Sequence, residues 1–491
     1  MVRYESTKQI SIEEFKTPFY RDLSSENRWV KLSKVVPWDH FAEIYMKVMD
    51  ERMGRPGVSP RIVLGALIIK HIKKLDDRGV IEEIQENPYM QYFVGLEEFT
   101  TEKVFEPSLF VEIRKRIGKK AFDELNELLI KSAVLEKEKK VRKKKKRMEG
   151  ENDEPPANKG KLKVDATVAD QYIKYPTDTN LLNEARKKLE KMIDDLYLQQ
   201  GKRGTKPRTY RRILDQAFLS FSKKRRKSTS TIRKMKRKLL ESLWRDLRHI
   251  DGMLDEFERD NKSFPIDKKA LRYLWIIRHV YEQQKQMYEK NINNIEERIV
   301  NLYQPHVRPI VRGKEKAKTE FGAKLEVSLD HGFVRVDHLG WDAYNEGRLL
   351  ISQVEKYRAL HGHYPELVQA DKIFSTRENR RWLRERGIRI TAAPLGRPPK
   401  KEKLSYYQRR KHKKEAAERN AIEGKFGQAK NGYNLNKIRA KLQNTSESWI
   451  SAIFFVINLL KYEKENFLLY FFKLIYGRDL IKPIATPTII K

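Results

Sequence analysis

The sequence lacks cysteine entirely over its 491 residues. Disulfide bonds and cysteine-ligated zinc sites are therefore excluded, and a reducing cytoplasm is compatible with the chain. Long hydrophobic runs are lacking as well. The most apolar stretch, residues 449–460 (WISAIFFVINLL), is shorter than the roughly 20 residues that a membrane-spanning helix needs. We predict that this stretch forms a buried helix.

Acidic side chains are scarce relative to basic ones. The chain carries 104 Lys and Arg residues against 68 Asp and Glu residues, a formal net charge of +36. Such a surplus predicts a polyanionic partner, most often nucleic acid. An anionic membrane surface is the rival partner, and a basic protein that is merely soluble is a third interpretation. Met1 is followed by charged residues rather than an apolar run, so we expect no secretory signal.

Residues 1–135 show helical periodicity. Ser59 and Pro60 suit the start of a helix, and apolar residues then recur at helical spacing. Asp76 suits the N-cap of the next helix, which Pro88 ends. We predict an N-terminal helical domain with helix-turn-helix proportions, used either for DNA binding or for packing and dimerisation.

A change of composition follows this domain. Residues 136–161 contain six consecutive basic residues (RKKKKR) and then a polar stretch with two prolines. Such a block repels itself and buries little apolar area. We therefore predict a basic, flexible linker.

Five short segments after the linker have the composition of strands. They are KLKVDATV, AKLEVSLD, GFVRVDHLG, ELVQAD and GIRIT, and the second and third form a hairpin. Two helical patterns, residues 345–362 and 376–387, precede the fourth and the fifth segment. This order predicts an α/β fold with a mixed sheet.

Residues 181–319 separate the first strand from the hairpin, and their pattern is mostly helical. Within them, residues 201–240 hold sixteen Lys and Arg residues and one acid, Asp215. We predict a basic helical insertion that contacts DNA phosphates, most strongly through Lys223, Lys224, Arg225, Arg226 and Lys227. A merely solvated helical face is the alternative.

The strands carry four carboxylates, Asp165, Asp330, Asp337 and Asp371. Asp165 lies inside an apolar strand, where a lone charged group is costly to bury. Asp371 follows an apolar strand, at the edge where open α/β sheets usually bind ligands. Because Ser375 and Thr376 are available to cap the next helix, Asp371 is free for other work.

A third candidate carboxylate lies in the segment ERNAIEGKFGQAKNGY, residues 418–433. Arg419, Glu423, Phe426 and Lys430 are spaced so that a helix would place them on one face. Glu423 could then bind a metal while Arg419 and Lys430 bind phosphates beside it. A surface helix with ordinary ion pairs is the alternative. Together, Asp165, Asp371 and Glu423 would supply three carboxylate ligands, whose oxygen atoms are the kind of ligand that magnesium prefers.

The segments VDATV, LVQADKIFSTRENRRWL and ERNAIEGKFGQAKNGY resemble, in order, the three acidic motifs of bacterial insertion-sequence DDE transposases of the IS-five type. The resemblance maps the family's catalytic and metal-binding acids onto Asp165, Asp371 and Glu423. Arg419 and Lys430 match the family's Tyr-Arg-Glu-Lys signature around Glu423. Ala416 stands where that signature has tyrosine.

The resemblance covers roughly residues 25–465, including the N-terminal helices. It implies a ribonuclease H-like core, with helices on both faces of its sheet, formed by residues 162–180 and 320–440. The helical insertion interrupts this core, and apolar C-terminal helices follow in residues 441–491. The implied cofactor is a pair of Mg²⁺ ions, with Mn²⁺ as a substitute, held by the three carboxylates.

The implied activity is transposition. Transposon-end DNA is hydrolysed, and the freed 3′-hydroxyl then attacks target DNA. The implied partner is double-stranded DNA, bound by a homodimer or higher oligomer in the cytoplasm at the nucleoid, with no membrane partner. Two alternatives remain open: an inactive or domesticated transposase that acts as a DNA-binding protein, and a ribonuclease H-like nuclease without strand transfer.

Overall fold

The computed structural model describes residues 14–16, 22–47, 49, 57–146, 158–202, 204–260, 262–311, 319–393 and 405–476. The chain divides into two compact units. The first unit contains Met1–Ala169, Leu325–Leu339 and Tyr344–Lys491, and the second contains Asp170–Lys324 and Gly340–Ala343. Within the described residues, no helix combines the length and the apolar character needed to cross a bilayer.

In the part of the chain that the structure describes, the helices before the first strand are α1 (Arg28–Ser33), α2 (Trp38–Met46), α3 (Pro60–Lys73), α4 (Asp77–Glu86), α5 (Pro88–Val94) and α6 (Leu109–Lys146). Pro60 holds the first position of α3, as predicted. Asp76 accepts hydrogen bonds from the N–H groups of Arg78 and Gly79 at the start of α4. Pro88 opens α5 because its fixed φ suits a first helical turn. The predicted helix starts are confirmed.

Helix α6 differs from the sequence-based expectation. It continues to Lys146, through the first part of the predicted linker, and its backbone leaves the helical region only at Gly118. Neither glycine nor proline occurs between Gly118 and Lys146, and strong helix formers dominate there. Charge repulsion alone therefore does not end this helix. The remainder of the predicted linker, residues 147–157, lies outside the described residues.

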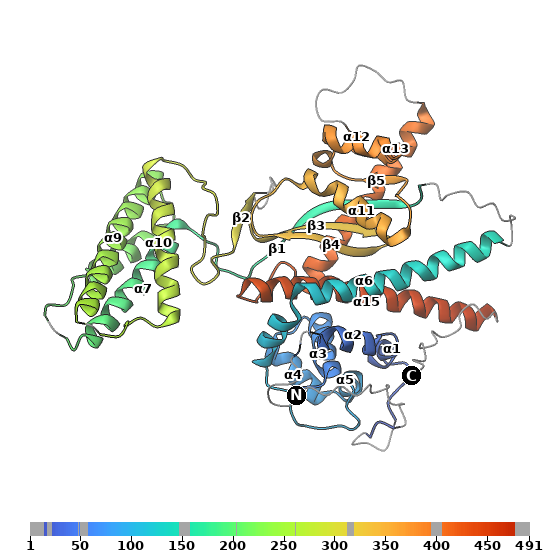
Figure 1. Cartoon of the computed structure of the whole chain (residues 1–491), viewed down its shortest axis with the longest axis horizontal. Coiled ribbons are helices and arrows are strands. Elements are labelled where there is room, and N and C mark those ends of the chain that lie inside the picture. The colour runs from blue at the N-terminus through green and yellow to red at the C-terminus, as the bar shows by residue number, and fades with distance from the viewer. Residues whose placement is uncertain are drawn as a thin grey trace. The chain divides into compact units, whose positions relative to one another are not determined.

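Helix α15 (Gln443–Tyr476) packs along α6, as Figure 1 shows. It contains the apolar stretch of residues 449–460, which is almost entirely buried, so the predicted buried helix is confirmed. Phe455 of α15 contacts Phe41 of α2 and Phe122 of α6, with ring centroids 5.2 and 6.1 Å apart. The C-terminal helix therefore shares one hydrophobic core with the N-terminal helices.

The strands among the described residues are β1 (Lys161–Asp170), β2 (Arg308–Val311), β3 (Thr319–Asp330), β4 (Phe333–Gly340), β5 (Leu367–Gln369) and β6 (Arg389–Ile390). Their order is β2-β3-β1-β5-β6, and β4 pairs with β3. β1 and β5 are parallel, as are β5 and β6, while β2 pairs antiparallel with the first residues of β3 inside the second unit. The mixed sheet and its five predicted strands are confirmed.

Strand β2 was not predicted. Its four residues are too few to show alternation, and Pro309 argues against a central strand. The structure places it at an edge of the sheet, where a proline is tolerated because one side of the strand needs no partner.

Helices cover both faces of the sheet in the first unit. The short helices η1 (Glu346–Leu349) and η2 (Lys372–Phe374) lie with α11 (Leu350–His361) and α12 (Arg377–Glu385). Leu162 and Val164 of β1 pack with Val354 of α11 and Leu383 of α12 in one hydrophobic cluster. On the other face, α13 (Tyr406–Glu418) contacts β5. It is followed by α14 (Asn420–Gly427) and the π-helical turn η3 (Gln428–Gly432), which contact each other.

The second unit is mainly helical. Its helices are α7 (Asp178–Gln199), α8 (Arg211–Lys223), α9 (Thr229–Arg259) and α10 (Lys268–Glu289), and α7, α9 and α10 pack together (Figure 1). Apolar stripes such as Leu189, Leu243 and Ile277 meet in its core. Arg186 is fully buried there and pairs with Glu190 at 2.5 Å.

A buried asparagine joins three elements of the first unit. Asn458 of α15 accepts a hydrogen bond from the Val334 N–H at 2.9 Å and donates to the Val334 carbonyl at 2.6 Å. It also donates to Asn126 of α6 at 2.7 Å.

The substitution Asn458→Ala would leave the buried groups of Val334 and Asn126 without this hydrogen-bond partner. We therefore expect a loss of about 2–4 kcal/mol in the free energy of unfolding, measured by chemical denaturation. The variant Gln443→Ala, at an exposed position at the start of the same helix, should change it by less than about 0.5 kcal/mol; equal losses would contradict this role.

The buried side chain of His71 leads us to expect that the first unit becomes less stable at low pH. Burial, followed by the charges of Lys70 and Arg114, lowers the pKa of His71 to about 3. The unfolded chain, with a pKa near 6.5, therefore binds this proton while the folded chain does not, and stability falls as pH drops below about 6.5.

We expect His71→Phe, which keeps an aromatic ring beside Trp449, to remove up to about 1.4 kcal/mol per pH unit of this slope between pH 6.5 and 5. Urea unfolding at several pH values measures it, with the exposed His40→Phe as control. Parallel slopes for wild type and His71→Phe would remove His71 as the cause.

Candidate functional site

The β1–β5 pair has one apolar and one polar face. Leu162 and Val164 of β1 and Val368 of β5 point into the hydrophobic cluster under α11 and α12. Because side chains alternate along a strand, Asp165 and Gln369 project to the opposite face, toward α13 and α14. This polar face carries Asp165, the first of the predicted carboxylates.

The register of the pair bears on the two aspartates. Lys161 pairs with Leu367 and Lys163 pairs with Gln369, where β5 ends. Neighbouring strands lie about 4.8 Å apart, and paired residues share a face. If the same register continued for two residues beyond β5, Asp165 would lie opposite Asp371. The strand pairing therefore predicts that these two acids, which are distant in the chain, lie close together.

Arg419 links this pair to the third acid. Its guanidinium donates to Asp165 at 2.9 Å and to Glu423 at 2.9 Å. Asp165 is mostly buried, with 16% of its side chain exposed, whereas Glu423 is 54% exposed. One positive group therefore neutralises two of the three predicted ligands. The sequence analysis assigned Arg419 to phosphate and did not predict this contact.

A polar layer holds α13 against the same face. Lys161 donates to Glu418 at 2.7 Å, and Gln369 donates to the Glu415 carbonyl at 2.5 Å. The hydrogen bond from Lys161 lowers the pKa of Glu418. Burial lowers the pKa of Lys163 on the same strand. These contacts fix where α14, and therefore Glu423, lies over the strands.

Asp371 is exposed and ordered by the backbone. Its carboxylate accepts a hydrogen bond from the Lys372 N–H at 2.6 Å and caps η2. Thr376 caps α12 by accepting from the Asn379 N–H at 3.2 Å, as the sequence predicted. The main helix after β5 therefore does not need Asp371.

The predicted common face of Arg419, Glu423, Phe426 and Lys430 is wrong in part. Phe426 is only 8% exposed and belongs with Ile422 and Ala429 to the buried side of this segment. Lys430 is half-buried in the π-helical turn η3, which breaks the regular spacing after Gly427. An α-helical periodicity cannot anticipate a wider turn, and such turns are frequent at functional sites.

The predicted DNA-contacting run lies in the second unit. Lys223 ends α8, and Lys224, Arg225, Arg226 and Lys227 form the turn before α9. All five side chains are exposed. Lys227 donates to the Lys224 carbonyl at 2.8 Å, which stabilises the turn. The run is therefore open to a large anionic partner.

A second group of metal-ligand type lies at the turn between β3 and β4. Asp330, His331 and His361 have ligand atoms within 4.8 Å of one another. The sequence analysis noted Asp330 but not the two histidines. Only their adjacency in DHG (residues 330–332) and HGH (residues 361–363) could have drawn attention to them.

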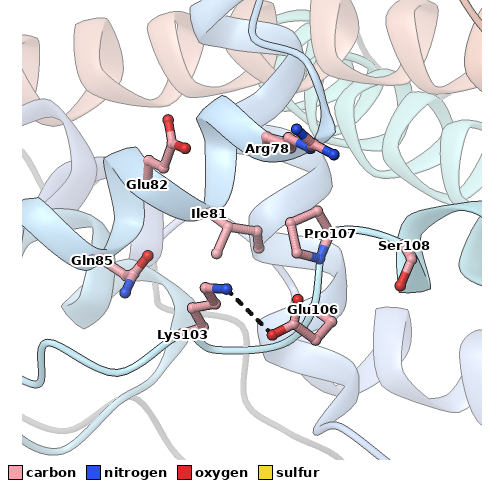
Figure 2. Close-up of a pocket in the computed structure, with 8 residues that line it drawn as sticks. All are labelled: Arg78, Ile81, Glu82, Gln85, Lys103, Glu106, Pro107 and Ser108. Atoms are coloured by element: carbon pink, nitrogen blue, oxygen red, sulfur yellow. Dashed lines mark hydrogen bonds and ion pairs between the residues drawn. The ribbon is translucent and has the colours of Figure 1, made fainter.

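A surface pocket of about 400 Å³ lies in the first unit between α4 and the segment before α6. Figure 2 shows its lining residues, among them Lys103 and Glu106, which form an ion pair at 3.3 Å. Acids and bases both line the pocket, and none of the predicted catalytic residues does. Its chemistry does not indicate a particular ligand.

Comparison with known proteins adds two family matches. Residues 18–116 match a family described as a transposase domain, and residues 368–460 match the transposase DDE domain. The second match includes Asp371 and Glu423. No solved structure matches the chain.

A curated relative covers part of the chain. An uncharacterized protein, ORF8 in the nfe locus of Rhizobium meliloti, is 29% identical over 175 residues, which are 35% of this chain and 77% of that protein. Two transposase matches thus follow one another along the chain, and the second makes the chain similar to transposases of the DDE type.

Proposed function

We propose that this chain is a transposase that binds the ends of an insertion sequence, cleaves DNA by metal-dependent hydrolysis and joins the freed 3′ end to target DNA. One observation carries the proposal. Arg419 ties Glu423 to Asp165, and the parallel pairing of β1 with β5, extended by two residues, supports a position of Asp371 close to Asp165. The mixed sheet with helices on both faces supports a ribonuclease H-like core for this chemistry.

The donor set fits divalent cations. DDE domains generally use such ions, and three carboxylates offer the oxygen ligands that Mg²⁺ or Mn²⁺ prefers. Asp165, Asp371 and Glu423 would hold them. When bound, a pair of such ions activates the attacking oxygen and stabilises the leaving oxygen of a phosphodiester.

Arg419 has two roles in this proposal. In the structure it neutralises Asp165 and Glu423, which limits the repulsion between two carboxylates on one face. Once cations neutralise these acids, the guanidinium would exchange them for a DNA phosphate, which it can bind through two N–H groups. Lys430, on the turn that follows α14, would contact a neighbouring phosphate.

DNA outside the catalytic face would meet the basic second unit. The exposed basic side chains from Lys223 to Lys227 would not read the DNA sequence, but they would neutralise phosphates and release the counterions bound to DNA. Two ends must be held together for transposition, so we propose a homodimer or higher oligomer on DNA.

The catalytic assignment is tested by Asp165→Asn, Asp371→Asn and Glu423→Gln. Each removes an anionic metal ligand while keeping nearly the same shape. We expect each to lower Mg²⁺-dependent cleavage of insertion-sequence end DNA by at least about a thousandfold, given the several kcal/mol of charge stabilisation that metal ions supply. Gel-shift binding of the same DNA should change little.

Glu378→Gln, an exposed acid at the start of α12, is the matched control and should cleave normally. A variant that still cleaves at the wild-type rate removes its residue from the proposed triad. A wild-type chain that binds but never cleaves indicates the inactive, DNA-binding alternative, to which Ala416 at the signature tyrosine position points. Cleavage without a joined product indicates a nuclease.

The basic run is tested by its salt dependence. Replacing Lys223, Lys224, Arg225, Arg226 and Lys227 by Gln should flatten the plot of log affinity against log salt by about 0.9 for each phosphate that the run no longer neutralises. Fluorescence anisotropy with duplex DNA between about 50 and 200 mM salt measures this slope. Arg225→Lys with Arg226→Lys keeps the charge and should keep the slope. An unchanged slope in the Gln variant identifies a merely solvated surface.

A further inference from the structure

The turn between β3 and β4 and the end of α11 meet at three side chains. Asp330 ends β3, His331 is in the turn and His361 ends α11. Asp330 accepts a hydrogen bond from Nδ1 of His331 at 2.6 Å and another from Nε2 of His361 at 2.6 Å. Each carboxylate oxygen thus accepts from one imidazole, and one ligand atom from each of the three groups lies within 4.8 Å of the others.

Burial makes this cluster unlike a surface ion pair. The His361 side chain is 2% exposed and that of Asp330 is 11% exposed, whereas His331 is 44% exposed. The ring of His361 stacks on Tyr357, with centroids 4.2 Å apart. Asp330 and His361 are therefore enclosed, and the cluster opens to solvent on the side of His331.

We propose that Asp330, His331 and His361 form a site for one divalent transition-metal ion, with zinc as its representative. Two imidazoles and one carboxylate suit such an ion, whereas Mg²⁺ prefers oxygen ligands alone. The site is separate from the three proposed catalytic carboxylates, which lie on β1, after β5 and on α14. It goes beyond the proposed DNA chemistry.

The geometry needs only small adjustments. A tetrahedral zinc ion with bonds of about 2.0–2.2 Å requires ligand atoms about 3.3–3.6 Å apart, and the three ligand atoms already lie within 4.8 Å of one another. A tautomer shift in each neutral imidazole moves its proton to the outer ring nitrogen and leaves a lone pair facing the ion. Lys163 lies within electrostatic range of Asp330. Its positive charge repels a cation at this site, so the bonds from the ligands to the ion must outweigh that repulsion.

Such an ion would tie the β3–β4 turn to the C-terminus of α11. His331 has a positive φ of 47°, and Gly332 follows it with a φ of 81°, so the turn has little freedom to present His331 differently. The exposed edge of His331 provides the entry path, and the fourth coordination position would face the same side.

The test is zinc binding by the full-length chain, first stripped of metal with a chelator. Titration against a chromophoric zinc indicator should give one tight site per chain, and excess Mg²⁺ should not displace the ion. His331→Ala and His361→Gln should each weaken zinc binding by more than about 100-fold. The loss of a residue that only hydrogen-bonds to a metal ligand typically weakens binding by about 10- to 100-fold. Zinc should raise the Tm of the wild type but not of His331→Ala.

His363→Ala is the matched control, because this imidazole neighbours His361 but is not one of the three ligands. It should bind zinc as the wild type does. A chain carrying Asp165→Asn, Asp371→Asn and Glu423→Gln should also keep the site, which separates this inference from the proposed catalytic function. Absence of stoichiometric zinc in the wild type, or unchanged affinity in His331→Ala, overturns the proposal.

Discussion

The parallel pairing of β1 with β5 is the constraint on which the candidate active site depends. Parallel strands cannot be joined by a tight turn, so the chain between them must leave the sheet and return. It does so through the helical second unit, β3, β4 and α11. A slip of one residue in this register would turn Asp165 toward the hydrophobic cluster and away from Asp371. The buried contacts of Leu162, Val164 and Val368 exclude that slip.

The two faces of this strand pair are stabilised differently. One face is an apolar core of ordinary type. The other carries a polar layer in which Lys161 and the Gln369 amide nitrogen both donate to Glu418, and Arg419 neutralises two carboxylates. The buried amide oxygen of Gln369 has no hydrogen-bond partner in the structure. The layer keeps α13 and α14 close to the sheet while leaving charged groups available for chemistry.

Much of this fold could be predicted from local pattern. The strands around Asp165 and Asp371 and the caps at Asp76 and Thr376 depend on alternation and on short-range hydrogen bonds, which sequence displays directly. β2 escaped prediction because four residues with a proline carry almost no periodic signal. Phe426 was misassigned because the helix buries a stripe beside Glu423, and a helical wheel without a tertiary partner does not say which side is inside.

The sequence by itself determined the charge that favours DNA, the absence of disulfides, the order of the acidic motifs and the resemblance to transposases. Only the tertiary structure decided that β1 pairs in parallel with β5, that Arg419 bridges Asp165 and Glu423, and that His361 reaches Asp330. The physical reason is range. Periodicity and capping act within a few residues, whereas Arg419 and Asp165 are 254 residues apart and meet only because strand register and helix packing bring them together.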